Sequence, residues 1–255
     1  MENKEARFVK SSLLRFFQGK DKKHTALRIG AVALLVLIIG ASLAYFTSRD
    51  TVTNQVSAEA AEISLLEPNW WSTGITAAEN TEPGMTIAKD PQVYNKSEEA
   101  SVYVRMKITV TDEDGNEITD DDAAGAKRLY AILSALYLND GTTQLLSIVY
   151  DEGENEITSL TSENSSFYYS GGWFYYVEAA TITGIALEIL APGDTTPTLF
   201  SYVVIPVLKT EYDGYFDAAF HIDIEAQAFP VDSVNDGEDA SLSEVINAFA
   251  DAYGY

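Results

Sequence analysis

The chain offers few of the side chains that perform catalysis or hold metal ions. Its 255 residues include no cysteine and two histidines, His24 and His221, so disulfides and thiolate chemistry are excluded. Zinc hydrolysis needs three protein ligands, commonly histidines, and a position open to water. The sequence contains neither an H-E-x-x-H motif nor the partners of a histidine-based triad. We therefore predict a non-enzymatic protein, with His221 on the outward face of a strand.

Acidic side chains are abundant, and they leave two kinds of site open. Asp112, Asp114 and Asn116 alternate in the loop TDEDGNEITDDD, a spacing that resembles a calcium loop without the glycine and final glutamate placement of an EF-hand. A solvated hairpin tip is the alternative. Two carboxylates facing across a cleft could serve a glycosidase, but the sequence singles out no pair. We expect no cofactor, with calcium left open at this loop.

Aromatic residues gather in the segment 167–178, FYYSGGWFYYVE. Aromatic faces pack on the apolar faces of sugars, so the segment could form a glycan platform. Cross-strand aromatic pairs in a hairpin around Gly171 and Gly172 would serve stability alone. The residues concerned are Phe167, Tyr168, Tyr169, Trp173, Phe174, Tyr175 and Tyr176.

The N-terminal segment 1–44 has the pattern of a secretory signal peptide. A front with eight Lys/Arg precedes an uncharged apolar run at 29–46, which spans 18 residues. Ser42 and Ala44 fit the small pockets of a signal peptidase, so we expect cleavage between Ala44 and Tyr45. The alternative is a retained signal anchor, because 18 apolar residues could just span a bilayer. The sequence therefore predicts an exported, secreted protein.

Cleavage would leave a strongly acidic mature chain. The leader holds eight of the 16 Lys/Arg and three of the 39 Asp/Glu, which leaves 8 bases against 36 acids, a net charge of −28 over 211 residues. Such a surface repels nucleic-acid phosphates and anionic lipid headgroups. We expect no nucleic-acid partner, and membrane contact only through an uncleaved leader.

Hydrophobic alternation predicts antiparallel strands. Residues 101–111, SVYVRMKITVT, place Val, Met and Ile on one parity and Tyr103, Arg105, Lys107 and Thr109 on the other, as in a strand with one buried and one wet face. A strand through Ile63 and Leu65 is expected to end at Pro68, and 151–166 reads as a polar loop. Further strands are predicted at 144–150, 182–190, 198–208 and 216–228.

Two helices interrupt this pattern. Apolar residues at helical spacing predict an inserted helix at 123–138, and Ser241 with Glu244 has the form of a capping box that opens a short C-terminal helix. The predicted fold is mainly β, a jelly-roll-type antiparallel β-sandwich over 61–255. It is preceded by an N-terminal arm at 45–60.

Six sequence stretches in order resemble the TasA and camelysin family, exported proteins of Gram-positive bacteria that the signal peptidase SipW processes. They are LAYFTSRDTVTN, ISLLEPNW, PGMTIAKDPQVYNKSEEASVYVRM, APGDTTPTLF, FHIDIEAQAF and INAF. The resemblance covers nearly the whole chain. The chain departs from the family pattern in one respect, its unusually long basic region ahead of the apolar run.

The resemblance implies a jelly-roll subunit of extracellular fibres, the protein scaffold of biofilms, linked by N-terminal donor strands. Such an arm has too little apolar surface to hold a shape alone, and it could add to the open edge of a neighbouring sandwich. Its larger apolar groups are Tyr45, Phe46, Val52 and Val56. The camelysin name carries a metalloprotease label, which the lone His221 of the mature chain argues against.

Two functions therefore stay open. The first is a secreted structural subunit of a surface or biofilm matrix fibre, which self-associates after the signal peptidase has acted. The second is a monomeric cell-surface adhesin that binds glycan or protein.

Overall fold

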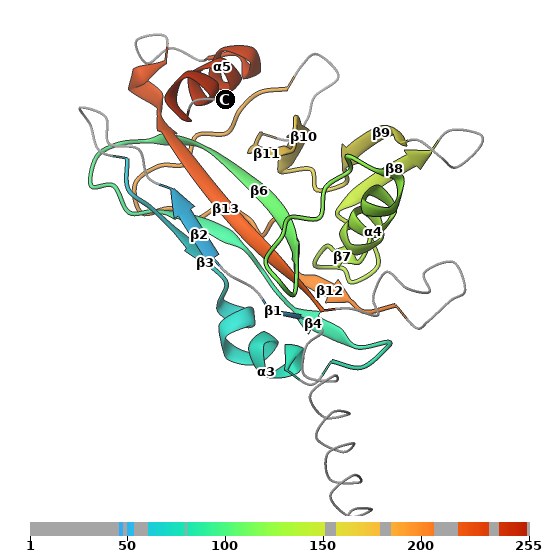
Figure 1. The fold of residues 1–255 in the computed structure, drawn as a ribbon. Helices are drawn as coiled ribbons and strands as arrows, with labels where there is room; N and C mark the ends of the chain where they lie inside the picture. Colours follow the sequence, from blue (N-terminus) through green and yellow to red (C-terminus); the bar gives the residue numbers. More distant parts are fainter. Residues whose placement is uncertain are drawn as a thin grey trace, which may run out of the picture. The chain divides into compact units, whose positions relative to one another are not determined.

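Two long strands form the centre of the structure, a computed structural model of the chain (Figure 1). β6 (Val102–Asp112) and β13 (Phe220–Pro230) pair antiparallel along their whole length, from Asp112 opposite Phe220 to Val102 opposite Pro230. The structure describes residues 46–47, 50–53, 61–79, 81–150, 157–178, 185–206, 219–234 and 240–253. All of these residues belong to the unit Ala44–Tyr255.

The sheet extends from this pair in both directions. On the β6 side follow β11 (Trp173–Tyr176) and then β10 (Phe167–Ser170), both antiparallel. On the β13 side lie β1 (Phe46–Thr47) and β2 (Asp50–Thr53), which both pair with β13 in parallel. The path through the sheet therefore runs β1, β13, β6, β11, β10, with β2 beside β1 on the same edge of β13.

Three smaller antiparallel sheets pack with the large one. They are β3 (Ile63–Leu66) with β5 (Gln92–Asn95); β4 (Thr86–Ala88), β12 (Tyr202–Val204) and β7 (Leu136–Tyr137); and β8 (Leu146–Tyr150) with β9 (Ile157–Ser162). Their apolar side chains share one buried core with the inserted helix α4 (Ala123–Leu133) and with Val104, Met106 and Val110 of β6. The predicted class, mainly β and sandwich-like, is confirmed.

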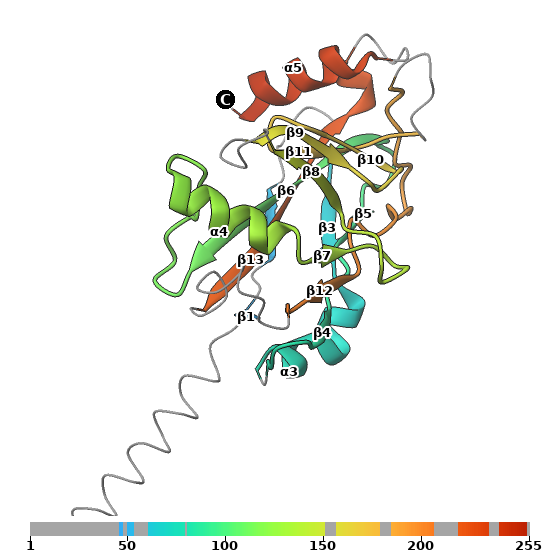
Figure 2. The same ribbon diagram turned by 90° about the vertical axis from the view of Figure 1, so that its right-hand side faces the viewer.

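The opposite face of the large sheet carries a second, smaller core. α5 (Leu242–Tyr253) lies across the end of the sheet where β6 begins and β13 ends (Figures 1 and 2). Its Val245 and Phe249 are fully buried against Tyr103, Trp173 and Tyr175. The predicted wet face of β6 is therefore wrong at its first half, where Tyr103 and Arg105 are buried. Where α5 covers it, β6 is therefore buried on both faces.

A short helical stretch follows Pro68 and comprises the π-helical turn η1 (Trp70–Gly74) and α3 (Ile75–Ala78). The Asp90 carboxylate, from a distant part of the chain, stabilises the start of this stretch. It accepts hydrogen bonds from the backbone N–H groups of Asn69 (2.9 Å) and Trp70 (3.2 Å). Lys89, beside it in the chain, forms a fully buried ion pair with Glu67 at 2.5 Å. The stretches EPNW (67–70) and AKDP (88–91) thus meet in one polar cluster, although 21 positions separate them.

Several predicted elements are confirmed. The hairpin around Gly171 and Gly172 pairs Ser170 with Trp173, and both glycines have positive φ, as a two-residue turn requires. The capping box also forms: the backbone N–H of Ser241 donates to Glu244 Oε2 (2.8 Å), and the N–H of Glu244 donates to Ser241 Oγ (3.4 Å). A last turn, η2 (Val231–Ser233), connects β13 towards this helix.

Other element boundaries differ from the prediction. The inserted helix ends at Leu133, not 138, because the N–H of Ala135 bonds to Ile132 O (3.0 Å) and Leu136 then pairs with Val203 as a strand. The expected polar loop at 151–166 contains β9, whose Leu160 lies opposite Ile148. Residues 185–190 form isolated bridges at Leu187 and Leu190 where a strand was predicted.

Across the ranges that the structure describes, no helix is both long and apolar enough to cross a membrane.

Candidate functional site

The outer edge of β13 is covered by part of the N-terminal arm. Phe46 and Thr47 lie opposite Phe220 and His221, and Asp50 to Thr53 lie opposite Ile224 to Gln227. A strand edge presents unpaired N–H and C=O groups, and an added strand satisfies them. The arm therefore completes the large sheet of its own chain at this edge.

The residues predicted for cleavage and strand donation are only partly described. Phe46 and Val52 have their backbones in β1 and β2, with Val52 opposite Ala226. Ser42, Ala44, Tyr45 and Val56 lie outside the described residues. The predicted cut would leave Tyr45 as the one residue ahead of Phe46, the first paired residue among those that the structure describes.

His221 lies between two strand neighbours, Thr111 of β6 and Thr47 of β1. The side chain points away from the main core, as predicted, because its neighbours Phe220 and Ile222 lie in that core. It is half-buried instead of exposed, and its Nδ1 atom is enclosed without a hydrogen-bond partner among the described residues. Within the described ranges, no group of three or more His, Asp or Glu side chains could hold a metal ion.

The acidic loop uses its calcium candidates to build a turn. Asp112 Oδ1 accepts from the backbone N–H groups of Asp114 (3.0 Å) and Asn116 (2.8 Å), and Asp112 Oδ2 accepts from the Asn116 side-chain amide (3.1 Å). The hydrogen bonds from the Asn116 side chain lower the pKa of Asp112 the most, and those from the backbone N–H groups add to this effect. Gly115 at φ 84° completes the predicted hairpin tip. Calcium binding here stays a prediction.

The aromatic segment serves both cores instead of forming a platform. Phe167 and Phe174 are buried in the main core, and Trp173 and Tyr175 are buried in the second. Tyr168, at 36%, is the one aromatic side chain of the segment that is exposed. Alternation along two paired strands sends successive rings to opposite faces, so the seven rings cannot share one surface.

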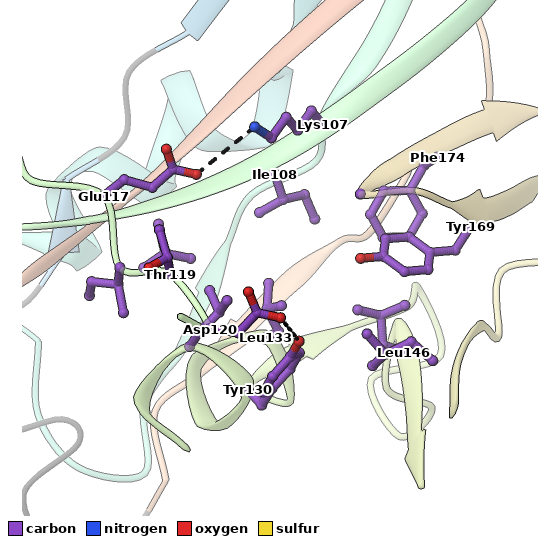
Figure 3. Close-up of a pocket in the computed structure, with 15 residues that line it drawn as sticks. Lys107, Ile108, Glu117, Thr119, Asp120, Tyr130, Leu133, Leu146, Tyr169 and Phe174 are labelled. Atoms are coloured by element: carbon purple, nitrogen blue, oxygen red, sulfur yellow. Dashed lines mark hydrogen bonds and ion pairs between the residues drawn. The ribbon is translucent and has the colours of Figure 1, made fainter. Parts of the chain in front are cut away.

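A cavity of about 300 Å³ opens between α4, β6 and the hairpin of β10 and β11 (Figure 3). Apolar side chains from five elements line one side of it: Ile108, Val110, Leu129, Leu133, Leu146, Leu160 and Phe174. Lys107 and Glu117 stand at its rim, 3.9 Å apart and partly exposed to solvent. A cavity of this size can hold a small molecule, and its lining combines apolar and polar side chains.

Three polar groups converge on this cavity, from α4, from the loop before it and from the hairpin. The Tyr130 hydroxyl of α4 donates to Asp120 Oδ2 at 2.8 Å, and Figure 3 shows the Tyr169 hydroxyl pointing from the hairpin towards this pair. Burial raises the pKa of Tyr130, and its hydrogen bond to Asp120 adds to the effect. Burial, and then the charge of Asp120, also raises the pKa of Tyr169. Both phenols therefore stay protonated at neutral pH and can donate hydrogen bonds.

The start of α4 positions these groups. Asp122 caps the helix, because its Oδ1 accepts from the N–H groups of Ala124 (2.9 Å) and Gly125 (2.8 Å). Gly125 packs closely on the preceding loop, where a Cβ would come 2.5 Å from Thr119 O. This contact holds the loop that carries Asp120 against the helix that carries Tyr130.

The sequence gives no signal for this cavity. The predicted helix contains Tyr130 and the predicted hairpin contains Tyr169, but no spacing places them beside Asp120. An acid that two further acids follow directly has the pattern of a solvated loop.

Comparison with protein-family models and with curated proteins found no match for this chain.

Proposed function

We propose that this protein is a secreted structural subunit of an extracellular fibre, at the cell surface or in a biofilm matrix. Subunits join when the N-terminal arm of one adds to the β13 edge of the next. One observation carries the proposal: residues 46–47 and 50–53 supply edge strands to β13. The jelly-roll form of the sandwich, the cut before Tyr45 and the SipW-type export belong to the same proposal.

The exchange of an arm between subunits needs no new kind of contact. The pairs that Asp50 to Thr53 make with Ile224 to Gln227 within one chain form equally between two chains. Exchange of an identical element is a low-cost route to association, and a head-to-tail contact that does not close produces an open filament. The arm is covalently held by the leader before cleavage, so assembly follows export.

One observation favours the second candidate, a monomeric adhesin. The arm pairs with β13 of its own chain, as it would in a stable monomer. The two functions differ in which chain supplies the edge strand, and an experiment can read this directly.

The chain has no cysteine, so one engineered pair reports on the arm alone. Thr51 and Glu225 are register partners, and neighbouring strands bring Cα atoms within disulfide range. We expect assembled Thr51→Cys/Glu225→Cys protein, once oxidised, to run as a ladder of covalent multimers on a non-reducing gel. Oxidation before assembly should lock the arm in place and prevent fibres until a reductant is added.

The single variant Thr51→Cys is the matched control and can give at most dimers. Oxidised fibres that run as monomers would refute strand exchange, and a protein that forms no fibres under any condition would favour the adhesin. Intact mass of protein from the cell surface should correspond to a chain that begins at Tyr45.

The proposal includes the absence of peptidase activity. His221 is the single histidine after the leader, and purified protein should cleave no general protease substrate with or without added zinc. Activity that a chelator abolishes and that His221→Ala removes would contradict this.

A further inference from the structure

The cavity beside α4 plays no part in the proposed strand exchange, and its lining has two distinct ends. Its apolar side is aliphatic apart from Phe174, with Ile108, Leu133 and Leu146 among its members (Figure 3). Sugars present hydroxyl groups all around the ring and would leave them unpaired against such a wall. The lining instead matches an apolar body.

The polar end has one acceptor in reserve. Asp120 accepts the Tyr130 hydroxyl on Oδ2, and no described residue donates to its Oδ1. The carboxylate is exposed to solvent at the cavity, so it keeps room for a donor from a ligand. The Tyr169 hydroxyl, which points to the same place, has no hydrogen-bond partner among the described residues.

The charges around the polar end of the cavity determine which ligand head group would fit there. Lys107 is the one cation among the described residues of the lining, and Glu117, 3.9 Å away, offsets its charge. Asp121 and Asp122 follow Asp120 directly, and Asp122 lies with its carboxylate on the N-terminus of α4. A carboxylate or phosphate head would meet net negative charge here, whereas an ammonium would gain a charge-assisted hydrogen bond.

We propose that this cavity binds a small amphiphilic amine. Its apolar body lies against Ile108, Leu133 and Leu146, and its ammonium group donates to Asp120 Oδ1. The Tyr169 hydroxyl hydrogen-bonds at the same end, and Tyr130 holds the carboxylate in place. The cavity of about 300 Å³ accommodates a body of one ring or a short alkyl chain.

Three probes of one shape test the head group: benzylamine, benzyl alcohol and benzoate. Each is titrated into the full-length chain at pH 7 while the backbone amide resonances of Thr119 and Gly172, at the cavity wall, are followed by NMR. We expect saturable shifts with benzylamine, about tenfold weaker binding of benzyl alcohol, because a charge-assisted hydrogen bond is lost, and no saturation with benzoate. This order is read in the unaltered chain and depends on no variant.

Two matched variants then locate the ammonium. Asp120→Asn should weaken benzylamine about tenfold and leave benzyl alcohol nearly unchanged, whereas Asp121→Asn, one residue further on, should change neither. The leader is present in every sample, so any binding to it is common to all of them. Benzoate that binds as tightly as benzylamine, an equal loss in both variants, or no saturable shift with any probe would overturn the proposal.

Discussion

Lys89 and Glu67 show how this acidic chain holds charge inside its core. Both side chains are fully buried, and Lys89 Nζ lies 2.5 Å from Glu67 Oε1. The Lys89 ammonium also lies 5.1 Å from the centre of the Trp70 ring. A buried ion loses its hydration, and only a close partner offsets that loss. The pair ties the end of β4 to the residues that precede η1.

We predict that Lys89→Met is strongly destabilising. Removing the cation leaves the Glu67 carboxylate buried without its ion-pair partner, which costs about 3–5 kcal/mol of unfolding free energy. Lys96→Met is the matched control, because Lys96 and Glu62 form a half-exposed pair at 3.8 Å, worth at most about 1 kcal/mol. Urea denaturation gives both values, and equal losses would contradict the assigned role of burial.

Arg105 illustrates what residue-level patterns can and cannot predict. Alternation correctly placed it opposite the main core, but its guanidinium carbon lies 3.9 Å from the centre of the Trp173 ring and 4.3 Å from that of Phe249. Its Nε donates to Gln227 Oε1 at 2.8 Å. The groups that bury it come from β11, β13 and α5, so its local sequence predicts a wet residue. Asp120, Tyr130 and Tyr169 escaped prediction for the same reason.

Among the elements, those with strong local signals could be predicted and those fixed by pairing could not. β6, the hairpin and the capped α5 carry their own alternation, turn residues or cap. β7 is two residues long, and it forms because Leu136 and Tyr137 pair with β12. β9 is polar in composition but pairs with β8. Such strands are set by partners distant in sequence, which override local propensity.

The turn η1 depends on a close contact between Gly74 and β4, which the sequence pattern did not predict either. A Cβ at Gly74 would lie 2.2 Å from Ala88 O and 2.5 Å from Trp70 Cε3. Backbone and a buried ring cannot both move aside. The glycine therefore lets the helical stretch pack directly on β4.

We predict that Gly74→Ala destabilises the protein by about 1–3 kcal/mol, the usual cost of overpacking a close contact. Ser72→Ala, in the same turn and exposed to solvent, should change stability by no more than about 0.5 kcal/mol. Thermal melting followed by circular dichroism compares them. If Gly74→Ala is neutral or stabilising, the close packing of η1 on β4 is wrong.

At the scale of the whole molecule, net charge bears on the proposed association between copies. The chain after the leader has 36 acids and 8 bases, and many acids lie in exposed loops such as 112–122. Like-charged subunits repel at long range, and this repulsion opposes the strand exchange proposed for the β13 edge. Salt limits its range to about 30 Å at 0.01 M and about 10 Å at 0.1 M.

We therefore predict that assembly increases with ionic strength and with acidity. Sedimentation velocity at 0.01 M and 0.1 M NaCl should show larger species at the higher salt, because screening shortens the repulsion. A shift from pH 7.5 to 4.5 should act in the same direction, since ordinary carboxyl pKa values of about 4 bring some acids towards neutrality and reduce the net charge. Sucrose at matched osmolality is the control for solvent effects and should change nothing.

Calcium chloride at the ionic strength of the NaCl sample separates screening from binding: equal assembly means screening alone, and greater assembly supports calcium bound by the acids. An oligomer distribution that is identical at both salt concentrations and both pH values would show that charge does not control association.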